Sequence, residues 1–262
     1  LREEGFSGDV TVASNGQAAT ITGLGNDNLK GTFTELELIG GGGPNKIDAS
    51  GFNFAITLQG GGGDDTLIGG SQGDSLDGGN GTDQIQQTVD LEQILTDTLV
   101  TGRGADTLTS IEEAVLIGGD FGTNIDARAF TGATTLIGNG GGDTLIGGSN
   151  NDVLSGGDGD DKLFGLGGND TADGGDGNDS VLGGDADDIL LGGSGNDTLL
   201  GEAGGDTLLG EDGDDNVDAG TETDTATGIG NGEADDDEDT VSGAESIDDA
   251  FVFDFDSIVA GF

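Results

Sequence analysis

The feature that most restricts the fold of this chain is a nonapeptide that repeats without interruption from Gly138 to Thr227. Each of these ten repeats has Asp at its sixth place and an apolar residue or Ala at its eighth. A second, shorter array of three repeats runs from Gly60 to Gln86 with the same two places filled. The sixth places of the two arrays are Asp65, Asp74, Asp83, Asp143, Asp152, Asp161, Asp170, Asp179, Asp188, Asp197, Asp206, Asp215 and Asp224.

One repeat predicts a turn followed by a short strand. Gly at the first, second and often the fourth place permits turn conformations that are closed to other residues, and a final triplet such as Thr207-Leu208-Leu209 suits a strand. Two consecutive repeats form one coil, which returns the chain to its starting side. We therefore expect an all-β fold, a parallel β-roll or β-solenoid with two short strands per 18-residue coil and the eighth-place side chain inside.

Stacking of such coils divides the sixth-place Asp residues between two edges of the roll. One edge takes Asp143, Asp161, Asp179, Asp197 and Asp215, and the other takes Asp152, Asp170, Asp188, Asp206 and Asp224. Neighbours on an edge lie one strand spacing, about 4.8 Å, apart, so their carboxylates repel strongly unless a cation lies between them.

The donor set favours calcium as that cation. The chain has no His and no Cys, so the ligands on offer are oxygens of Asp and of turn carbonyls, which select Ca²⁺ over transition metals. We expect multiple Ca²⁺ ions between the stacked turns, about nine if each gap between edge neighbours holds one. Nine ions would change the formal net charge from −47 to about −29.

The composition also excludes whole classes of function. Without His or Cys the chain has no imidazole base and no thiolate nucleophile, and we predict no enzymatic activity. Its acidity repels nucleic acid and anionic membranes, and its longest apolar runs are too short to span a bilayer. A Gly/Asp-rich disordered spacer is the main alternative to a fold, but a spacer needs no fixed apolar eighth place.

A longer repeat lies over the nonapeptides. Adding 78 to the residue number maps Ile47, Leu58 and Asp65 onto Ile125, Leu136 and Asp143, and a phrase at Asp27 recurs at Asp106. We expect one continuous solenoid with four segments. These are a first unit with the short array (1–87), a second copy of the irregular unit (88–137), the long array (138–227), and an acidic loop with a hydrophobic C-terminal cap (228–262).

One segment of the second unit admits two predictions. Between Asp90 and Leu99 the apolar residues have helical spacing. The counterpart from Val10 to Ile21 instead predicts a hairpin about Asn15-Gly16. The pattern of the residues leaves both open.

The repeats resemble the RTX calcium-binding β-roll family, whose pattern is Gly-Gly-x-Gly-x-Asp-x-apolar-x. The resemblance implies Ca²⁺ held between a turn and the turn two repeats later by sixth-place Asp and loop carbonyls. It also implies export through a type I secretion channel and folding on Ca²⁺ outside the cell. The phrases at Ile47 to Phe52 and Ile125 to Phe130 resemble connecting units of RTX-type surface-layer and adhesin chains, and the tail from Asp249 to Phe262 resembles the hydrophobic cap of many RTX proteins.

Two classes of function fit these features. The first is a secreted Ca²⁺-binding structural protein of the cell exterior, in a surface layer, adhesin or filament, which associates with further copies of itself. The second is the C-terminal secretion and folding module of an exported enzyme or toxin. The doubled 78-residue unit favours the first, because a secretion module does not need it. The start at Leu1, with no Met and no hydrophobic leader, predicts a processed or excised fragment.

The ninth places of the long array predict an assembly surface. On one sheet they form an apolar stripe of Ile146, Phe164, Leu182 and Leu200, whereas the other sheet carries Ser155 and Asp173 before Leu191 and Leu209. A continuous apolar patch of this kind is usually covered in monomeric proteins. We expect lateral packing of two rods along the stripe.

Overall fold

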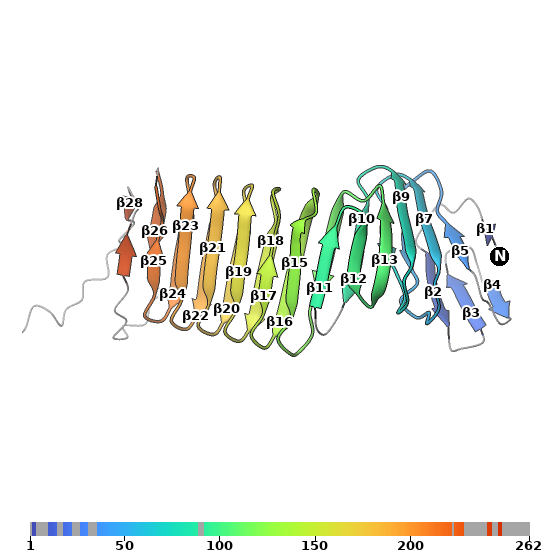
Figure 1. Cartoon of the computed structure of the whole chain (residues 1–262), viewed down its shortest axis with the longest axis horizontal. Coiled ribbons are helices and arrows are strands. Elements are labelled where there is room, and N and C mark those ends of the chain that lie inside the picture. Colours follow the sequence, from blue (N-terminus) through green and yellow to red (C-terminus); the bar gives the residue numbers. More distant parts are fainter. Residues whose placement is uncertain are drawn as a thin grey trace, which may run out of the picture.

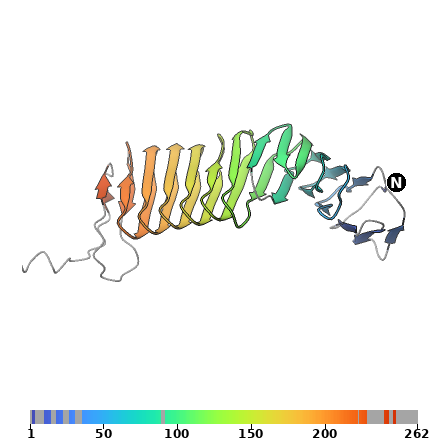
Figure 2. The same cartoon turned by 60° about the horizontal axis from the view of Figure 1, so that its bottom comes forward.

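The protein is an elongated stack of strands, with the strands nearest the N-terminus at one end of the stack and the last described strands at the other (Figures 1 and 2). This computed structural model describes residues 36–88, 92–221 and 223–227, together with strands at 2–3, 10–14, 18–22, 27–30, 240–242 and 246–247. The predicted acidic loop at 233–239, the predicted cap at 249–262 and the turn at Asn15-Gly16 lie outside the described residues. In the described part no helix could cross a membrane.

The described strands form two sheets of 14 strands each. The first sheet contains, in spatial order, β1 (Arg2–Glu3), β5 (Glu37–Ile39), β7 (Thr57–Gly62), β9 (Ser75–Asn80), β13 (Gly104–Thr109), β12 (Leu99–Gly102), β11 (Glu92–Thr96), β15 (Asn124–Ala129), β17 (Thr144–Ile146), β19 (Lys162–Gly167), β21 (Ser180–Asp185), β23 (Thr198–Ala203), β25 (Asn216–Asp218) and β27 (Thr240–Ser242). The second contains β28 (Ser246–Ile247), β26 (Thr225–Thr227), β24 (Thr207–Asp212), β22 (Ile189–Ser194), β20 (Thr171–Asp176), β18 (Val153–Asp158), β16 (Ala133–Gly140), β14 (Glu113–Ile117), β10 (Gln84–Thr88), β8 (Thr66–Ile68), β6 (Lys46–Asp48), β2 (Val10–Ser14), β3 (Ala18–Thr22) and β4 (Asp27–Lys30).

The nonapeptide arrays build the roll that their spacing predicts. Successive repeats alternate between the sheets, and each strand pairs in parallel with the strand two repeats later, as Leu163 with Val181 and Leu190 with Leu208. The eighth-place side chains of the long array are buried between the two sheets and form a core one side chain deep per strand. The prediction of an all-β parallel solenoid with two strands per coil is confirmed.

Most strands of the long array are longer than the predicted triplet. Strand β22 continues from Ile189 through the first three places of the next repeat to Ser194, and these places pair with β24 as well. At the second place of the repeat the backbone has a positive φ, for example 107° at Gly193 and 72° at Glu202. The chain therefore bends sharply inside a strand that stays hydrogen-bonded to its neighbours.

The segment for which the sequence allowed either a helix or a hairpin forms part of a β-meander. Strands β11 and β12 are antiparallel, with Leu95 opposite Val100, and β12 turns back into β13. Gln93 and Leu95 are buried while Glu92 and Ile94 are exposed, which is the two-residue alternation of a strand. The helical prediction is wrong and the hairpin prediction is confirmed, in agreement with the antiparallel pair β2 and β3.

The second-place glycines yield a test of the stacking. A methyl group on Gly193, whose φ is 107°, would collide with the carbonyl oxygen of Gly175 in the preceding coil. We expect Gly193→Ala to lower the free energy of unfolding by about 1–3 kcal/mol at saturating Ca²⁺. Gly167→Ala is the matched control, because a methyl there meets only one atom, at 4.0 Å, and should cost less than about 0.5 kcal/mol. Equal losses in thermal unfolding would contradict this account of the turn.

Candidate metal centre

Two ladders of buried carboxylates run along the roll where the strands begin. In the first ladder the backbone N–H of Asp161 donates to Oδ1 of Asp179 at 2.7 Å, and the N–H of Asp179 donates to Oδ1 of Asp197 at 2.7 Å. In the second ladder the N–H of Asp170 donates to Oδ1 of Asp188 at 2.8 Å. Every step joins Asp residues two repeats apart, so one oxygen of each carboxylate ties its own coil to the preceding one.

The short array has the same arrangement. Asp65 donates its N–H to Oδ1 of Asp83 at 2.8 Å, and Asp74 belongs to the other edge. All thirteen sixth-place Asp residues are at most 3% exposed, so the structure places the whole predicted set in buried ladders.

The second oxygen of the carboxylate, Oδ2, is the one that could bind a metal, because Oδ1 already accepts a backbone N–H from the preceding coil. Oδ2 is buried and has no hydrogen-bond partner among the described residues in Asp65, Asp83, Asp143, Asp161, Asp170, Asp179, Asp188, Asp197 and Asp224. A buried oxygen without a donor is costly, and more so when it carries charge. A cation is the partner that such an acceptor-only oxygen can use.

A backbone carbonyl lies beside most of the orphan oxygens. Around Gly174, the point where a Cβ would sit is 2.5 Å from Oδ2 of Asp179 and 2.5 Å from the carbonyl oxygen of Gly192 in the next coil. Gly192 has the same neighbours, Asp197 and Gly210, each at 2.5 Å. The first-place Gly thus keeps side-chain atoms away from a recurring pair of oxygens, one from each of two successive coils.

Burial raises the pKa of most of the sixth-place carboxyls. Loss of hydration is the largest cause, the backbone N–H of the preceding coil partly opposes it, and neighbouring carboxylates add to it at Asp170 and Asp179. The pKa rises to about 7 at these two residues and to about 6 at Asp65, Asp161 and Asp188. It is also raised, from the same first cause, at Asp74, Asp83, Asp143, Asp152 and Asp197.

Two predicted residues have a different local geometry. Oδ2 of Asp74 accepts the N–H of Gly70 at 2.6 Å, and Oδ2 of Asp152 accepts that of Gly148 at 2.6 Å. These repeats occupy equivalent places in the two 78-residue units. Because both carboxylate oxygens already have donors, Asp74 and Asp152 fit a cation less well than the rest of the ladders.

The ladders also include residues that the nonapeptide pattern missed. Asp106 extends the edge of Asp74, whose N–H it accepts at 2.9 Å, and burial raises its pKa to about 7. Glu112 accepts the N–H of Asp83 at 3.0 Å. The available signal for Asp106 was the segment from Thr101 to Thr109, which keeps Gly at the second and fourth places, Asp at the sixth and Leu at the eighth, and lacks only the first-place Gly.

Side chains alone do not complete a metal site. No three His, Cys, Asp or Glu side chains in the described part of the chain converge as a metal-binding group. Any cation on the ladders must therefore take backbone carbonyls as further ligands. Carbonyl and carboxylate oxygens without nitrogen or sulfur suit a hard cation with flexible coordination, which fits Ca²⁺ better than Zn²⁺ or Cu²⁺.

Comparison with known families agrees with this chemistry. The model of the RTX calcium-binding nonapeptide repeat matches residues 57–85, 95–110 and, in overlapping copies, 129–226, which together exceed half of the chain. The chain belongs to the RTX calcium-binding nonapeptide repeat family. No curated protein matches it individually. The RTX match includes 95–110, so it covers Asp106 and the meander strand β13.

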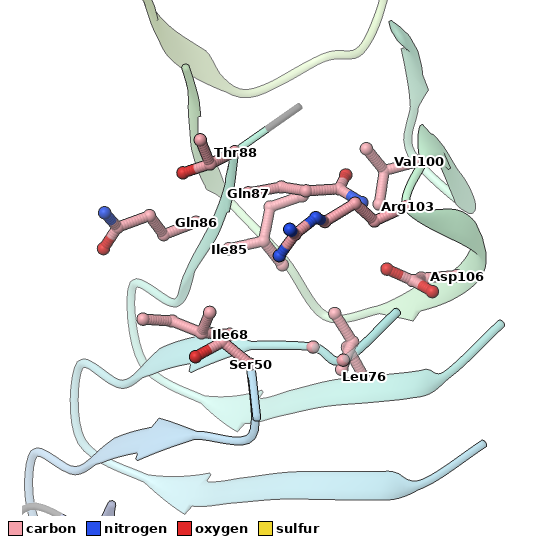
Figure 3. Close-up of a pocket in the computed structure, with 12 residues that line it drawn as sticks. Ser50, Ile68, Leu76, Ile85, Gln86, Gln87, Thr88, Val100, Arg103 and Asp106 are labelled. Carbon is pink, nitrogen blue, oxygen red and sulfur yellow. The ribbon is translucent and has the colours of Figure 1, made fainter. Parts of the chain in front are cut away.

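Where the RTX pattern breaks, between the two arrays, there is a small cavity of about 50 Å³. Ile85, Gln87, Val100, Arg103 and Asp106 contribute to its lining (Figure 3). Gln87 is 8% exposed and its amide has no hydrogen-bond partner among the described residues. The cavity therefore marks an imperfectly packed junction, in contrast to the regular core of the arrays.

The raised pKa values predict how pH acts on this RTX roll without metal. Between the ordinary Asp value of 3.8 and about 7, the folded ladders bind protons that the unfolded chain releases. The stability of the metal-free fold should therefore increase as pH falls from about 7 to about 4. We expect more β signal in far-UV circular dichroism in EDTA at pH 5 than at pH 8.

If Ca²⁺ binds these carboxylate oxygens, it competes with protons for them, and Ca²⁺ affinity should fall over the same pH range. Binding at pH 6 should release protons, which calorimetry in buffers of different ionisation enthalpy would detect. An affinity that stays constant from pH 8 to pH 5.5 would contradict the assignment of the raised pKa values to the binding carboxyls.

Proposed function

We propose that this protein is a secreted structural protein whose β-roll is made rigid by Ca²⁺ and serves extracellular assembly. The observation that carries the proposal is the row of buried, unpartnered Oδ2 atoms along both ladders. A row of buried carboxylates is unfavourable by itself, and binding of a cation between successive coils removes both the desolvation cost and the repulsion. Calcium binding and folding are then one linked process.

The proposed ligands are the thirteen sixth-place Asp residues. Those with an orphan Oδ2, such as Asp161, Asp179 and Asp197, are the strongest candidates. Each would act with first-place and other turn carbonyls of its own and the next coil. Asp106 would join them at the break between the arrays, since it has the same place in the ladder.

We propose a separate role for each of the four sequence segments. The arrays within 1–87 and 138–227 would bind the ions, and the irregular part at 88–137 would join the arrays. The tail at 228–262 would end the roll. The duplication of the 78-residue unit favours a structural protein over the secretion module of an exported enzyme, because it repeats the whole unit and adds no catalytic group.

A charge-matched pair of substitutions tests the ligand assignment. Asp179→Asn removes a carboxylate whose Oδ2 is buried without a partner, whereas Asp185→Asn removes an exposed one in the next turn. We expect Asp179→Asn to weaken binding at one or two sites by about tenfold or more and to lower the Ca²⁺ stoichiometry measured by calorimetry. Asp185→Asn should leave the stoichiometry unchanged. If both variants titrate like the original protein, Asp179 is not a ligand.

The outer face of the first sheet supports the assembly role. At the seventh and ninth places of the repeats on β17, β19, β21 and β23, the outward side chains are Thr144, Ile146, Lys162, Phe164, Ser180, Leu182, Thr198 and Leu200, all only partly buried or exposed. None of these eight is acidic, although the chain has 53 Asp and Glu in 262 residues. The exposed Asp185 and Glu202 lie further along β21 and β23, in the next repeats. The apolar stripe lies between Asp126 and Asp218 on the adjoining strands.

The occupant of this face is proposed to be a second copy of the chain. Two such stripes, with no acidic side chain at their seventh and ninth places, can approach each other although the rest of the surface is strongly acidic, and bound Ca²⁺ lowers the remaining repulsion. The outward positions of the second sheet include Asp173, whose pKa is raised by burial. A carboxylate there makes that face the less suitable one.

Paired substitutions on the two faces test this surface. Phe164→Thr with Leu182→Thr should preserve Ca²⁺-induced folding and reduce association in sedimentation velocity with Ca²⁺. Leu191→Thr with Leu209→Thr likewise replaces two apolar side chains by Thr, but on the second sheet, and should leave association intact. The idea fails if the original protein stays monomeric at high concentration with Ca²⁺, or if the first-sheet variant associates as strongly as the original.

A further inference from the structure

The N-terminal strands have the same pairing as the meander in the middle of the chain. In the N-terminal copy Val12 pairs with Ile21, and Ile21 pairs with Asp27. In the internal copy Leu95 pairs with Val100, and Val100 pairs with Asp106. Strands β2, β3 and β4 therefore correspond to β11, β12 and β13, with Asp27 in the place of Asp106.

The other sheet shows the same correspondence. Strand β1 pairs in parallel with β5, Arg2 opposite Glu37, as β10 pairs with β14, Gln86 opposite Val115. Since Glu37 and Val115 are one 78-residue unit apart, Arg2 corresponds to Gln86 and residue 1 to Ile85. Strands β1 and β4 of the N-terminal copy thus correspond to β10 and β13 of the internal copy, with one strand of each pair in each sheet.

In the internal copy these two strands are covered by a nonapeptide coil. Strand β13 pairs in parallel with β9, Leu108 opposite Leu76, and Asp74 donates its N–H to the Asp106 carboxylate at 2.9 Å. Strand β10 pairs with β8, Ile85 opposite Leu67. The array from Gly60 onward thus continues through this face with its hydrogen-bond ladder unbroken on both edges.

In the N-terminal copy the equivalent strands β4 and β1 are the terminal strands of the two sheets, counting the described strands. The edge of a terminal parallel strand offers backbone N–H and C=O groups to another strand. We propose that this face, formed by β1 and β4, is a docking face for a coil of RTX nonapeptide repeats that runs directly into residue 1. The inference rests on the proposed function, because the docked coil would complete a further step of the calcium ladders.

The internal copy, in which β9 pairs with β13, indicates which kind of strand fits this face. A matching strand must present Asp-x-Leu-x in register with Asp27-Asn28-Leu29-Lys30, as Asp74-Ser75-Leu76-Asp77 does with Asp106-Thr107-Leu108-Thr109. Asp27 would accept the N–H of the Asp in that strand.

The test adds such a coil to the whole protein. A second copy of residues 57–84 is joined directly ahead of residue 1, so that Gln84 precedes Leu1 as it precedes Ile85 in the chain. We expect about two additional Ca²⁺ ions, one within the added coil and one between it and Asp27. Hydrogen exchange of the amides at 27–30 should slow relative to the unextended protein, and thermal unfolding should remain a single transition.

Two matched variants separate docking from calcium binding by the added segment alone. Asp27→Ala should remove about one ion from the extended protein and none from the original. The extended protein with Asn at the three added inward positions that copy Leu58, Leu67 and Leu76 should bind no additional ions. Unchanged exchange at 27–30, an Asp27→Ala variant that loses nothing, or coupling of original molecules end to end through this face would overturn the proposal. An original protein that binds no Ca²⁺ would instead overturn the proposed function.

Discussion

The repulsion and desolvation of stacked carboxylates is the constraint on which this structure depends. Two full negative charges one strand spacing apart, about 4.8 Å, repel by roughly 3 kcal/mol at an effective dielectric constant of about 20, and each ladder repeats this along its length. One oxygen of Asp179 is satisfied by the backbone of the preceding coil, and the other has no donor in the described chain. The raised pKa values express the same cost in another form.

The other elements of the repeat serve this arrangement. First-place glycines such as Gly174 leave space around the orphan oxygen, and second-place residues such as Gly193 reverse the chain with a positive φ. The eighth-place side chain, Leu190 for example, fills a core only one residue deep on each side. Such a thin core buries little apolar area per ordered residue, so the folded state needs a further source of stability. Calcium bound between the coils would supply it.

Sequence reasoning predicted what the repeat determines locally and failed where tertiary context decides. The inward eighth places and the two-repeat step of the ladders follow directly from the spacing. The meander was ambiguous because the buried Gln93 is polar and the exposed Ile94 is apolar, which hides the alternation of a strand. Asp74 and Asp152 have ordinary repeat sequences, and only the turn geometry reveals that Gly70 and Gly148 occupy their second oxygens. Asp106 escaped the pattern because its repeat begins with Thr101 in place of Gly and is out of register with both arrays, 23 residues after Asp83.

The most direct test of the central claim is far-UV circular dichroism of the whole protein at pH 8 during titration with Ca²⁺ from EDTA. If the buried carboxylates hold the ions, the metal-free chain is largely unfolded, and the β signal develops cooperatively as about nine ions bind. Magnesium at the same concentration should be a poor substitute, because it requires closer and more regular coordination. A full β signal in EDTA at pH 8, unchanged by Ca²⁺, would contradict the account.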